Sequence, residues 1–350
     1  MRKIAVIGNF GESGQPIADG QTIKTRILTS ELQNQYGSDE VVVFNTYGGT
    51  INILKAPIYS FLALWRAKNV LILPAHNGVR VFPLLLVMLS MFFRGRRLHY
   101  SVIGGWLPQM ITTKPLLRYL LKQFDGIYVE TQTMKRALKS HGLENIYLLP
   151  NFKPLNIVNI DSSDSVCNIP YRLCTFSRVS KEKGIVDAIN IVDKINRTQG
   201  KTIYTLDIYG QIDADQEELF KSIFTTVPEY VQYKGVADFN KSVEVLKPYF
   251  ALLFPTHYYT EGIPGTIIDA YSAGVPVISA KWESFADIVD DNKTGLGYEF
   301  DDIRQLESML VSIIDNPQKL ERLKEECIKK AQQYQPHIAI QPLLNNLIDN

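Results

Sequence analysis

Short apolar runs alternate with helix-length amphipathic segments along the chain, and this alternation occurs twice. The apolar runs have the length of buried strands, so each series indicates a parallel sheet with helices on both faces. A polar stretch at 156–168 separates the two series and is predicted to be an interdomain linker. The sequence therefore predicts an α/β protein with two Rossmann-like domains, 1–155 and 169–325, facing across a cleft. The last segment, 326–350, is expected to pack back on the first domain.

The apolar runs give the predicted strands, which are 3–7, 41–45, 70–73, 98–103, 126–130 and 146–149 in the first series, and 171–177, 205–209, 231–234, 251–254, 275–279 and 295–298 in the second. The main helices of the second series are predicted at 184–197, 215–225, 240–247, 266–273, 285–289 and 303–315.

The composition is that of a globular protein, with 45% hydrophobic and 21% charged residues in a chain of 350. The three cysteines, Cys167, Cys174 and Cys327, match no zinc pattern, and their odd number disfavours a disulfide framework. The first apolar run breaks at Gly8 and Asn9, so it indicates a buried strand and not a signal peptide. We therefore expect a cytoplasmic protein.

The formal net charge of +1 hides an asymmetry between the two halves. Residues 1–150 contain 17 Lys and Arg and 8 Asp and Glu, whereas residues 151–350 contain 20 and 28. The halves therefore carry +9 and −8. We expect the first half to attract anions or anionic surfaces.

The stretch THYYTEGIPGTIIDAYSAGVPVISA, residues 256–280, places two acids around a glycine-rich turn that opens a helix. The turn follows an apolar strand, and ligands of parallel sheets bind at the carboxyl ends of strands. The backbone N–H groups of Gly265 and Thr266, at the start of the helix, would form an anion site. Gly262 allows the backbone to approach a ligand closely.

The two acids suit neutral hydroxyl groups at the two ends of an anion. Glu261 lies in the turn, and Asp269 is predicted to lie in the first turn of the helix. Each carboxylate can accept hydrogen bonds from hydroxyl groups, while the helix start binds a diphosphate between them. A nucleotide-sugar has this layout of ribose, diphosphate and sugar.

Two cations are available to balance the charge of a diphosphate. The segment FSRVSKEKG, residues 176–184, ends another predicted strand and carries Arg178 and Lys183 before a helix. Both cations would stabilise a leaving diphosphate. Taken singly, each is explained as well by a surface ion pair or a helix start. Combined with the acid pair, the set favours a functional site.

These segments resemble the carboxyl-terminal half of retaining GT-B glycosyltransferases of family four, the glycosyltransferase group 1 family, which includes bacterial enzymes of capsular, exopolysaccharide and O-antigen synthesis. The matching pieces are, in order, SRVSKEKG, LDIYGQ, VQYKGV, FPTHYYTEGIPGTIIDAYSAGVPVIS and IVDDNKTGLGY. The resemblance implies that Arg178 and Lys183 bind the donor diphosphate. It also implies that Glu261 contacts the donor sugar, beside Gly262 and Ile263, and that Asp269 holds the ribose. The family usually has Glu at the place of Asp269.

The resemblance further implies a reaction. A sugar would pass, with retention of anomeric configuration, from a nucleotide-sugar to a glycan or lipid-linked glycan in cell-surface polysaccharide synthesis. A UDP-sugar is the expected donor. No metal ion or other cofactor is expected.

The first half matches the family loosely. A Gly-Gly turn of the family aligns with Asp19-Gly20, so Gly20 is expected to lie near the donor phosphates. His76 ends a predicted strand and is a candidate for the acceptor side. Gly104 and Gly105 occupy the place where many family members carry a His.

The segment 81–97 joins an apolar run to Arg94, Arg96 and Arg97. The run is too short to span a bilayer. It is explained either as a buried Rossmann helix with a basic end or as a peripheral contact with anionic membrane through the arginines, on the inner face of the cell membrane.

Other functions fit the sequence less well. Asp213-Ala-Asp215 has the D-x-D form of a metal site, but its position before a helix indicates an N-cap and a polar first turn. Aromatic residues are not interleaved with basic ones, so no nucleic-acid partner is expected. The alternatives to a glycosyltransferase are a sugar-nucleotide epimerase of GT-B-like fold and a non-catalytic nucleotide-sugar binding protein.

Overall fold

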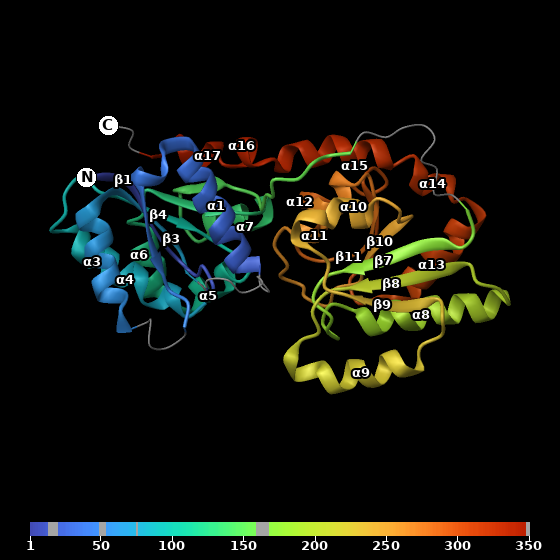
Figure 1. Ribbon diagram of the computed structural model, residues 1–350. Helices are drawn as coiled ribbons and strands as arrows, with labels where there is room; N and C mark the ends of the chain where they lie inside the picture. The colour runs from blue at the N-terminus through green and yellow to red at the C-terminus, as the bar shows by residue number, and fades with distance from the viewer. Residues whose placement is uncertain (13–19, 49–53, 75, 159–167, 348–350) are drawn as a thin grey trace. The chain divides into compact units, whose positions relative to one another are not determined.

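The computed structural model describes residues 1–12, 20–48, 54–74, 76–158 and 168–347, and the chain divides into two compact units (Figure 1). Unit 1 comprises Met1–Lys153 and Pro336–Asn350, and unit 2 comprises Pro154–Gln335. Each unit contains one six-stranded sheet, and every strand pairing is parallel. The predicted α/β class with two Rossmann-like domains is confirmed.

The sheet of unit 1 has the order β2-β1-β3-β4-β5-β6. Its strands are β1 (Arg2–Gly8), β2 (Val41–Asn45), β3 (Ala67–Leu73), β4 (Arg97–Ser101), β5 (Gly126–Val129) and β6 (Ile146–Leu148). Its longer helices are α1 (Gly20–Tyr36), α3 (Ala56–Arg66), α4 (Phe82–Ser90), α5 (Leu107–Thr113), α6 (Pro115–Leu121) and α7 (Gln132–Ser140), and two short helices, α16 (Pro336–Ala339) and α17 (Gln341–Leu344), complete it. Alternate strand residues face the two sides of the sheet. One side packs on α3 to α7, and the other packs on α1 and the carboxyl-terminal helices.

The sheet of unit 2 has the order β12-β11-β10-β7-β8-β9. Its strands are β7 (Tyr171–Phe176), β8 (Tyr204–Tyr209), β9 (Val231–Gly235), β10 (Ala251–Phe254), β11 (Val277–Lys281) and β12 (Gly295–Glu299). Its helices are α8 (Ile185–Gln199), α9 (Glu217–Thr226), α10 (Ser242–Leu246), α11 (Gly265–Ser272), α12 (Phe285–Ile288), α13 (Ile303–Asp315), α14 (Gln318–Glu321) and α15 (Lys324–Ala331). Figure 1 shows α10, α11 and α15 on one face of this sheet and α8, α9 and α13 on the other, and the apolar clusters agree. The order reverses between β7 and β10, and this reversal fixes where a ligand site is expected.

The boundaries of the two units differ from those predicted at the linker, 156–168, and at the start of the last segment, 326. Residues 156–158 do not form a loose linker, because the Val158 N–H donates to the Ser272 carbonyl at 2.9 Å in unit 2. The rest of the predicted linker, with Cys167, lies outside the described residues, apart from Asn168. The segment 326–335 stays with unit 2, where Cys327, Ala331 and Tyr334 pack in the cluster around α11. The residues from Pro336 onward belong to unit 1.

Candidate active site

β7 and β10 are neighbours in unit 2 at the point where the strand order reverses. The loops 177–184 and 255–264 follow their carboxyl ends and lead into α8 and α11. Ligands of open α/β sheets bind at such a reversal. All the donor-site residues predicted in the second half of the chain lie on these loops or on α11.

The two loops are in direct contact at Gly184. This residue has a φ of 71°, and a Cβ built on it would lie 1.9 Å from the Pro255 carbonyl oxygen. No side chain fits there. The His257 N–H also donates to the Glu182 carbonyl at 2.8 Å. The contact therefore sets the distance between loop 177–184, which carries Arg178 and Lys183, and loop 255–264, which carries Glu261.

Lys183 and Glu261 form an ion pair across the two loops. The side chains are only 13% and 16% exposed. The Lys183 Nζ also lies 4.9 Å from the centre of the Tyr258 ring and 5.6 Å from that of Phe254, so the cation has an aromatic wall. The Thr256 hydroxyl donates to Glu261 at 3.3 Å. The ammonium group is thus held in a fixed place beside the carboxylate.

Arg178 makes a bidentate ion pair with Asp213. Its Nη1 donates to the two carboxylate oxygens at 3.1 and 3.0 Å, and the arginine side chain is 48% exposed. Asp213 does hold the N-cap position of a short 3₁₀ turn, but its side chain makes no capping hydrogen bond. The predicted N-cap position is therefore confirmed, while the carboxylate pairs with the guanidinium of Arg178.

The start of α11 is suited to an anion. The helix begins at Gly265, after Pro264 at the N-cap, and no side chain caps it. The N–H groups of Gly265 and Thr266 have no intrahelical carbonyl to bind, whereas that of Ile267 donates to the Pro264 carbonyl at 3.1 Å. The Thr266 hydroxyl oxygen is buried and has no hydrogen-bond partner among the described residues. Polar atoms in such a position are normally satisfied, so a ligand is expected here.

Asp269 lies in the second turn of α11 and not in the first, because the helix begins at Gly265. Its side chain is 4% exposed, and its Oδ1 accepts a hydrogen bond of 3.0 Å from Ser242 on α10. Ile263 is also buried, with its side chain in the cluster around α11. Its side chain is therefore not available to a ligand, and Gly262 is buried as well.

His257 is a part of the site that sequence reasoning missed. Its Nε2 lies 2.6 Å from Asp187 on α8, and its Nδ1 lies 2.7 Å from Asp301. Burial opposes a charged imidazole, but the hydrogen bonds to Asp301 and Asp187 outweigh it and raise the pKa of His257 above its usual value. The ring therefore joins the loop to α8 and to the turn after β12, and its two carboxylate partners favour the protonated form.

This pKa shift predicts a pH-dependent stability. Because the folded-state pKa is raised, the stabilising contribution is fully present below the unfolded value of 6.5 and is lost as the pH rises through the folded value. The difference in unfolding free energy between the wild type and His257→Gln, measured with urea, should be larger at pH 6 than at pH 9. The exposed His337 provides a control, since His337→Gln should show no such trend. A difference that grows with pH would contradict the assignment.

The predicted residues of the first half all lie in unit 1. Gly20 opens α1 and is exposed, with open space where a Cβ would be. His76 follows β3, and its ring centre lies 5.1 Å from that of Trp106. Gly104 and Gly105 precede Trp106 in the loop after β4, so this loop and His76 are neighbours. The acceptor-side candidates are therefore close to each other.

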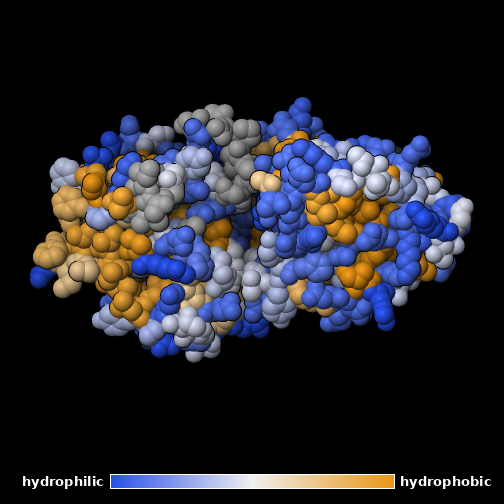
Figure 2. All heavy atoms as spheres, turned by 90° about the horizontal axis from the view of Figure 1, so that it is seen from below, coloured by the Kyte–Doolittle hydropathy of each residue, from blue (hydrophilic) through white to orange (hydrophobic). Residues whose placement is uncertain are grey.

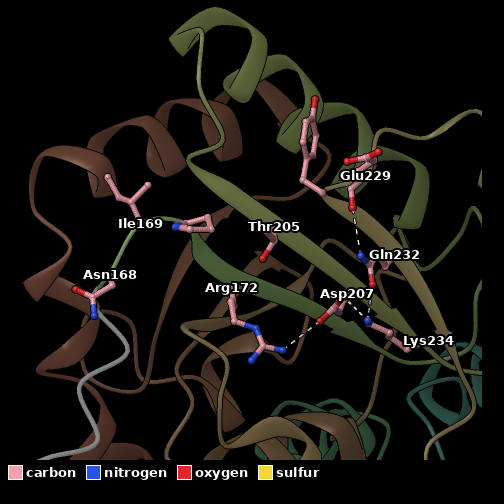
Figure 3. A pocket seen from close by; sticks show the side chains of 10 residues that line it. Asn168, Ile169, Arg172, Thr205, Asp207, Glu229, Gln232 and Lys234 are labelled. Carbon is pink, nitrogen blue, oxygen red and sulfur yellow. Dashed lines mark hydrogen bonds and ion pairs between the residues drawn. The ribbon is translucent and has the colours of Figure 1, made fainter.

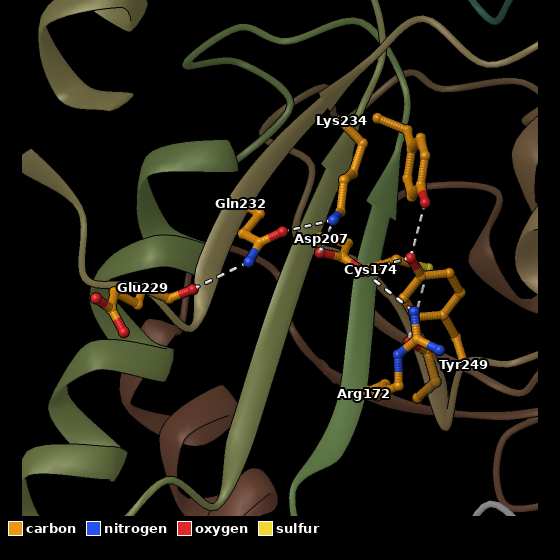
Figure 4. Close-up of polar contacts among 9 residues, drawn as sticks. Arg172, Cys174, Asp207, Glu229, Gln232, Lys234 and Tyr249 are labelled. Atoms are coloured by element: carbon orange, nitrogen blue, oxygen red, sulfur yellow. Dashed lines mark hydrogen bonds and ion pairs between the residues drawn. The ribbon is translucent and has the colours of Figure 1, made fainter. Parts of the chain in front are cut away.

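A second polar group surrounds Asp207 on β8 and lines a pocket of about 460 Å³ (Figure 3). The Asp207 carboxylate accepts hydrogen bonds from Tyr249 at 2.6 Å and Arg172 at 3.4 Å, and Lys234 lies 3.5 Å away (Figure 4). Burial raises the pKa of Cys174 beside it well above the usual value, so the thiol is not a nucleophile. The two cations, Arg172 and Lys234, share the single carboxylate of Asp207. None of the predicted site residues lines this pocket.

No group of three or more His, Cys, Asp or Glu within the described ranges is arranged to hold a metal ion.

Residues 168–332 match the family model "Glycosyl transferases group 1". The glycogen synthase of Mycobacterium tuberculosis (strain CDC 1551 / Oshkosh) is 25% identical over 153 residues, which are 44% of this chain and 36% of that protein. The chain thus matches little more than a third of the length of this curated relative. The region matched by the family model, residues 168–332, contains every predicted donor-site residue of unit 2.

Solved structures resemble the chain over almost its whole length. HepE from Anabaena, in complex with UDP and glucose, has a TM-score of 0.73 at 16% identity and covers 99% of both chains. Sucrose-phosphate synthase from Thermosynechococcus elongatus has a TM-score of 0.76 at 14% identity, with 97% of both chains covered. The lipopolysaccharide outer core galactosyltransferase WaaB, in its apo form, has a TM-score of 0.71 at 16% identity and covers 98% of both chains.

The chain therefore has the GT-B fold, with two Rossmann-like units. The family model covers residues 168–332 of the 350-residue chain, which is less than half of its length.

Proposed function

We propose that the protein is a retaining glycosyltransferase that takes a sugar from a UDP-sugar. The observation that carries this proposal is the ion pair between Lys183 and Glu261 beside the start of α11, at the strand-order reversal in the region that the family model matches. HepE, which was solved with UDP and glucose, supports the choice of uridine in the donor.

The residues of the candidate site would bind different parts of the donor: the diphosphate and the sugar. A diphosphate at the start of α11 would bind the N–H groups of Gly265 and Thr266 and the unpartnered hydroxyl of Thr266. Lys183 and Arg178 would then exchange part of their ion pairs with Glu261 and Asp213 for the diphosphate oxygens. The released Glu261 oxygens would accept hydrogen bonds from hydroxyl groups of the sugar.

Asp269 has a narrower role in this proposal. Its Oδ1 already accepts from Ser242, so ribose hydroxyls would share a carboxylate that is partly engaged within the protein. Metal-independent transfer is part of the proposal, since the cations and the helix start supply the positive charge that a leaving diphosphate needs.

The donor is identified by thermal shift of the purified protein with a panel of UDP-, GDP-, ADP- and dTDP-sugars. A donor present at a hundred times its dissociation constant should add about 2.7 kcal/mol to the unfolding free energy. We expect a shift with UDP-sugars that is lost in Arg178→Ala and Glu261→Ala. Lys181→Ala, an exposed cation of the same loop, is the matched control and should keep the shift.

The outcome also separates the alternatives. No shift with any sugar nucleotide at saturation would contradict the donor site. A shift without release of UDP would indicate a binding protein, and conversion of the sugar while UDP stays attached would indicate an epimerase.

The proposed acceptor is a glycan or lipid-linked glycan of cell-surface polysaccharide synthesis. The galactosyltransferase WaaB, a lipopolysaccharide outer core enzyme by its name, supports this class of acceptor. A lipid-linked acceptor requires contact with a membrane, and the charge of +9 on residues 1–150 supports a peripheral contact with anionic lipid. No helix among the described residues is long and apolar enough to cross a membrane.

A further inference from the structure

Helix α3 presents apolar side chains to solvent as well as to the core. One face of the helix buries Ala63 and Leu64. On the opposite side Ile58, Phe61 and Trp65, which are three and four residues apart, are 59%, 47% and 60% exposed. A surface helix normally places polar residues on its outer face, so this arrangement needs a partner.

Helix α4 continues the same pattern. Its sequence FPLLLVMLS contains no charged residue. Met88 is 56% exposed, and Met91 and Phe92, directly after the helix, are 75% and 83% exposed. On α6, Leu116 and Tyr119 are 60% and 62% exposed.

These side chains belong to one layer of unit 1. Helix α4 packs between α3 and α6 on one face of the sheet. Phe61 meets Phe93 edge to face at 5.5 Å, and the Arg96 Nε donates to the Leu64 carbonyl at 2.9 Å. Figure 2 shows hydrophobic side chains gathered on the surface of unit 1, on the left of the view. We call this surface the α3–α4 face and define it by Ile58, Phe61, Trp65, Met88, Met91 and Phe92.

The segments that form the α3–α4 face carry charge of one sign, although Asp39, from the neighbouring segment, lines a pocket together with Trp65 and Arg66. The sequence from 41 to 124 contains ten Lys and Arg and no Asp or Glu. Lys55, Arg66 and Arg94 are exposed at the ends of α3 and after α4. A protein partner would normally meet acids as well as bases, whereas an anionic lipid surface attracts cations alone.

The arginines predicted for membrane contact differ in their surroundings. The Arg96 Nε is bonded to the Leu64 carbonyl, and the Arg97 Nη1 donates to the Asn346 carbonyl at 2.8 Å. Each of these two guanidinium groups therefore uses at least one hydrogen-bond donor within the protein. Arg94 is exposed, but it lies beside Phe92, whose apolar ring is the more exposed feature.

We propose that the α3–α4 face docks on an anionic lipid bilayer, with its apolar side chains entering the boundary between head groups and acyl chains. Exposed aromatic and aliphatic side chains with a cationic rim are the features of interfacial membrane binding. The mode is surface docking, because α3 and α4 have 11 and 9 residues and are too short to span. This inference rests on the membrane contact proposed above and is independent of the donor site.

The test is co-sedimentation of the full chain with vesicles of phosphatidylcholine, alone or mixed with phosphatidylglycerol. We expect binding to the mixed vesicles that weakens as salt is added. The double variant Trp65→Ser/Phe92→Ser should lower the partition coefficient at least tenfold, since each ring buries a large apolar area on insertion. Arg66→Gln/Arg94→Gln should lower it on the order of fivefold per residue, and only on anionic vesicles.

Two controls keep the result interpretable. Val236→Ser removes a 69% exposed apolar side chain from unit 2 and should leave vesicle binding unchanged. The thermal shift with UDP should be the same in the wild type and in Trp65→Ser/Phe92→Ser, which shows that the fold and the donor site are intact.

Three outcomes would overturn the proposal. They are an absence of vesicle binding by the wild type, unchanged binding by Trp65→Ser/Phe92→Ser, and a wild-type dimer that this variant dissociates without any effect on vesicles. The last result would assign the face to a second copy of the chain. Loss of the UDP thermal shift in the wild type would contradict the donor site and would leave the docking result unaffected.

Discussion

Lys183→Ala is expected to lower the rate of UDP release from the donor sugar by roughly 10²–10³-fold, which is the usual cost of removing one group that stabilises a developing charge. The ammonium group is 13% exposed and held between Glu261 and two aromatic rings, so it needs no reorganisation when the diphosphate leaves. Its removal also leaves Glu261 unpaired in a partly buried place, which disfavours the bound anion further. The measurement is kcat and KM for UDP release.

Lys181→Ala is the control that distinguishes a specific role of Lys183 from a general effect of removing one positive charge. Lys181 lies two residues away in the same loop, and its side chain is exposed. It changes the net charge by the same amount, so a general electrostatic effect would appear equally in both variants. Equal losses, or a Lys183→Ala variant with wild-type kcat, would refute the assigned role of Lys183.

The second large effect is expected at Gly184. Gly184→Ala places a Cβ 1.9 Å from the Pro255 carbonyl oxygen at a φ of 71°. The clash is with backbone, so no side-chain rotation relieves it. The loops 177–184 and 255–264 must separate, and we expect a loss of about 3 kcal/mol or more in unfolding free energy. Binding of UDP should be lost with it.

Gly200→Ala separates steric clash from backbone strain. Gly200 caps the other end of α8 with a φ of 62°, but a Cβ there meets nothing within 4 Å. It carries the same left-handed strain, which costs about 1 kcal/mol, and should bind UDP normally. Urea unfolding and UDP thermal shift of both variants measure the two contributions. If Gly200→Ala were as harmful as Gly184→Ala, the contact between the loops would not be the cause.

Local periodicity predicted the elements of the fold well where an apolar run ends at a turn. The strands β2 and β10 and the helix α13 have the predicted bounds. The strand predicted at 275–279 begins at Val277 instead, because the Val275 N–H closes the end of α11 on the Ala270 carbonyl. An apolar run does not show which of its residues will form hydrogen bonds with the end of the preceding helix. The first residue of β11 could therefore not be predicted from the sequence.

The sequence predicts the residues of the candidate site but not which of them pair with each other. Glycines, cations and acids at strand ends indicated a diphosphate site from local sequence alone. The pair of Lys183 and Glu261 joins residues 78 positions apart, and Asp213 reaches Arg178 over 35 positions. Only the strand order, which brings β7 beside β10 and β8, creates these contacts. His257 gave no signal, since a single His in a loop carries no pattern of its own.

Unit 1 is assembled from two stretches of chain that the whole of unit 2 separates. Ile340 and Leu343, from the late stretch, pack against Ile4, Val6 and Leu28, which are among the earliest residues. During synthesis on the ribosome this apolar surface stays uncovered until unit 2 and the stretch that follows it have been made. A fragment that ends at Lys153 would leave the surface open to water. Unit 2, by contrast, is one uninterrupted stretch, so it is the part that can be excised and studied by itself.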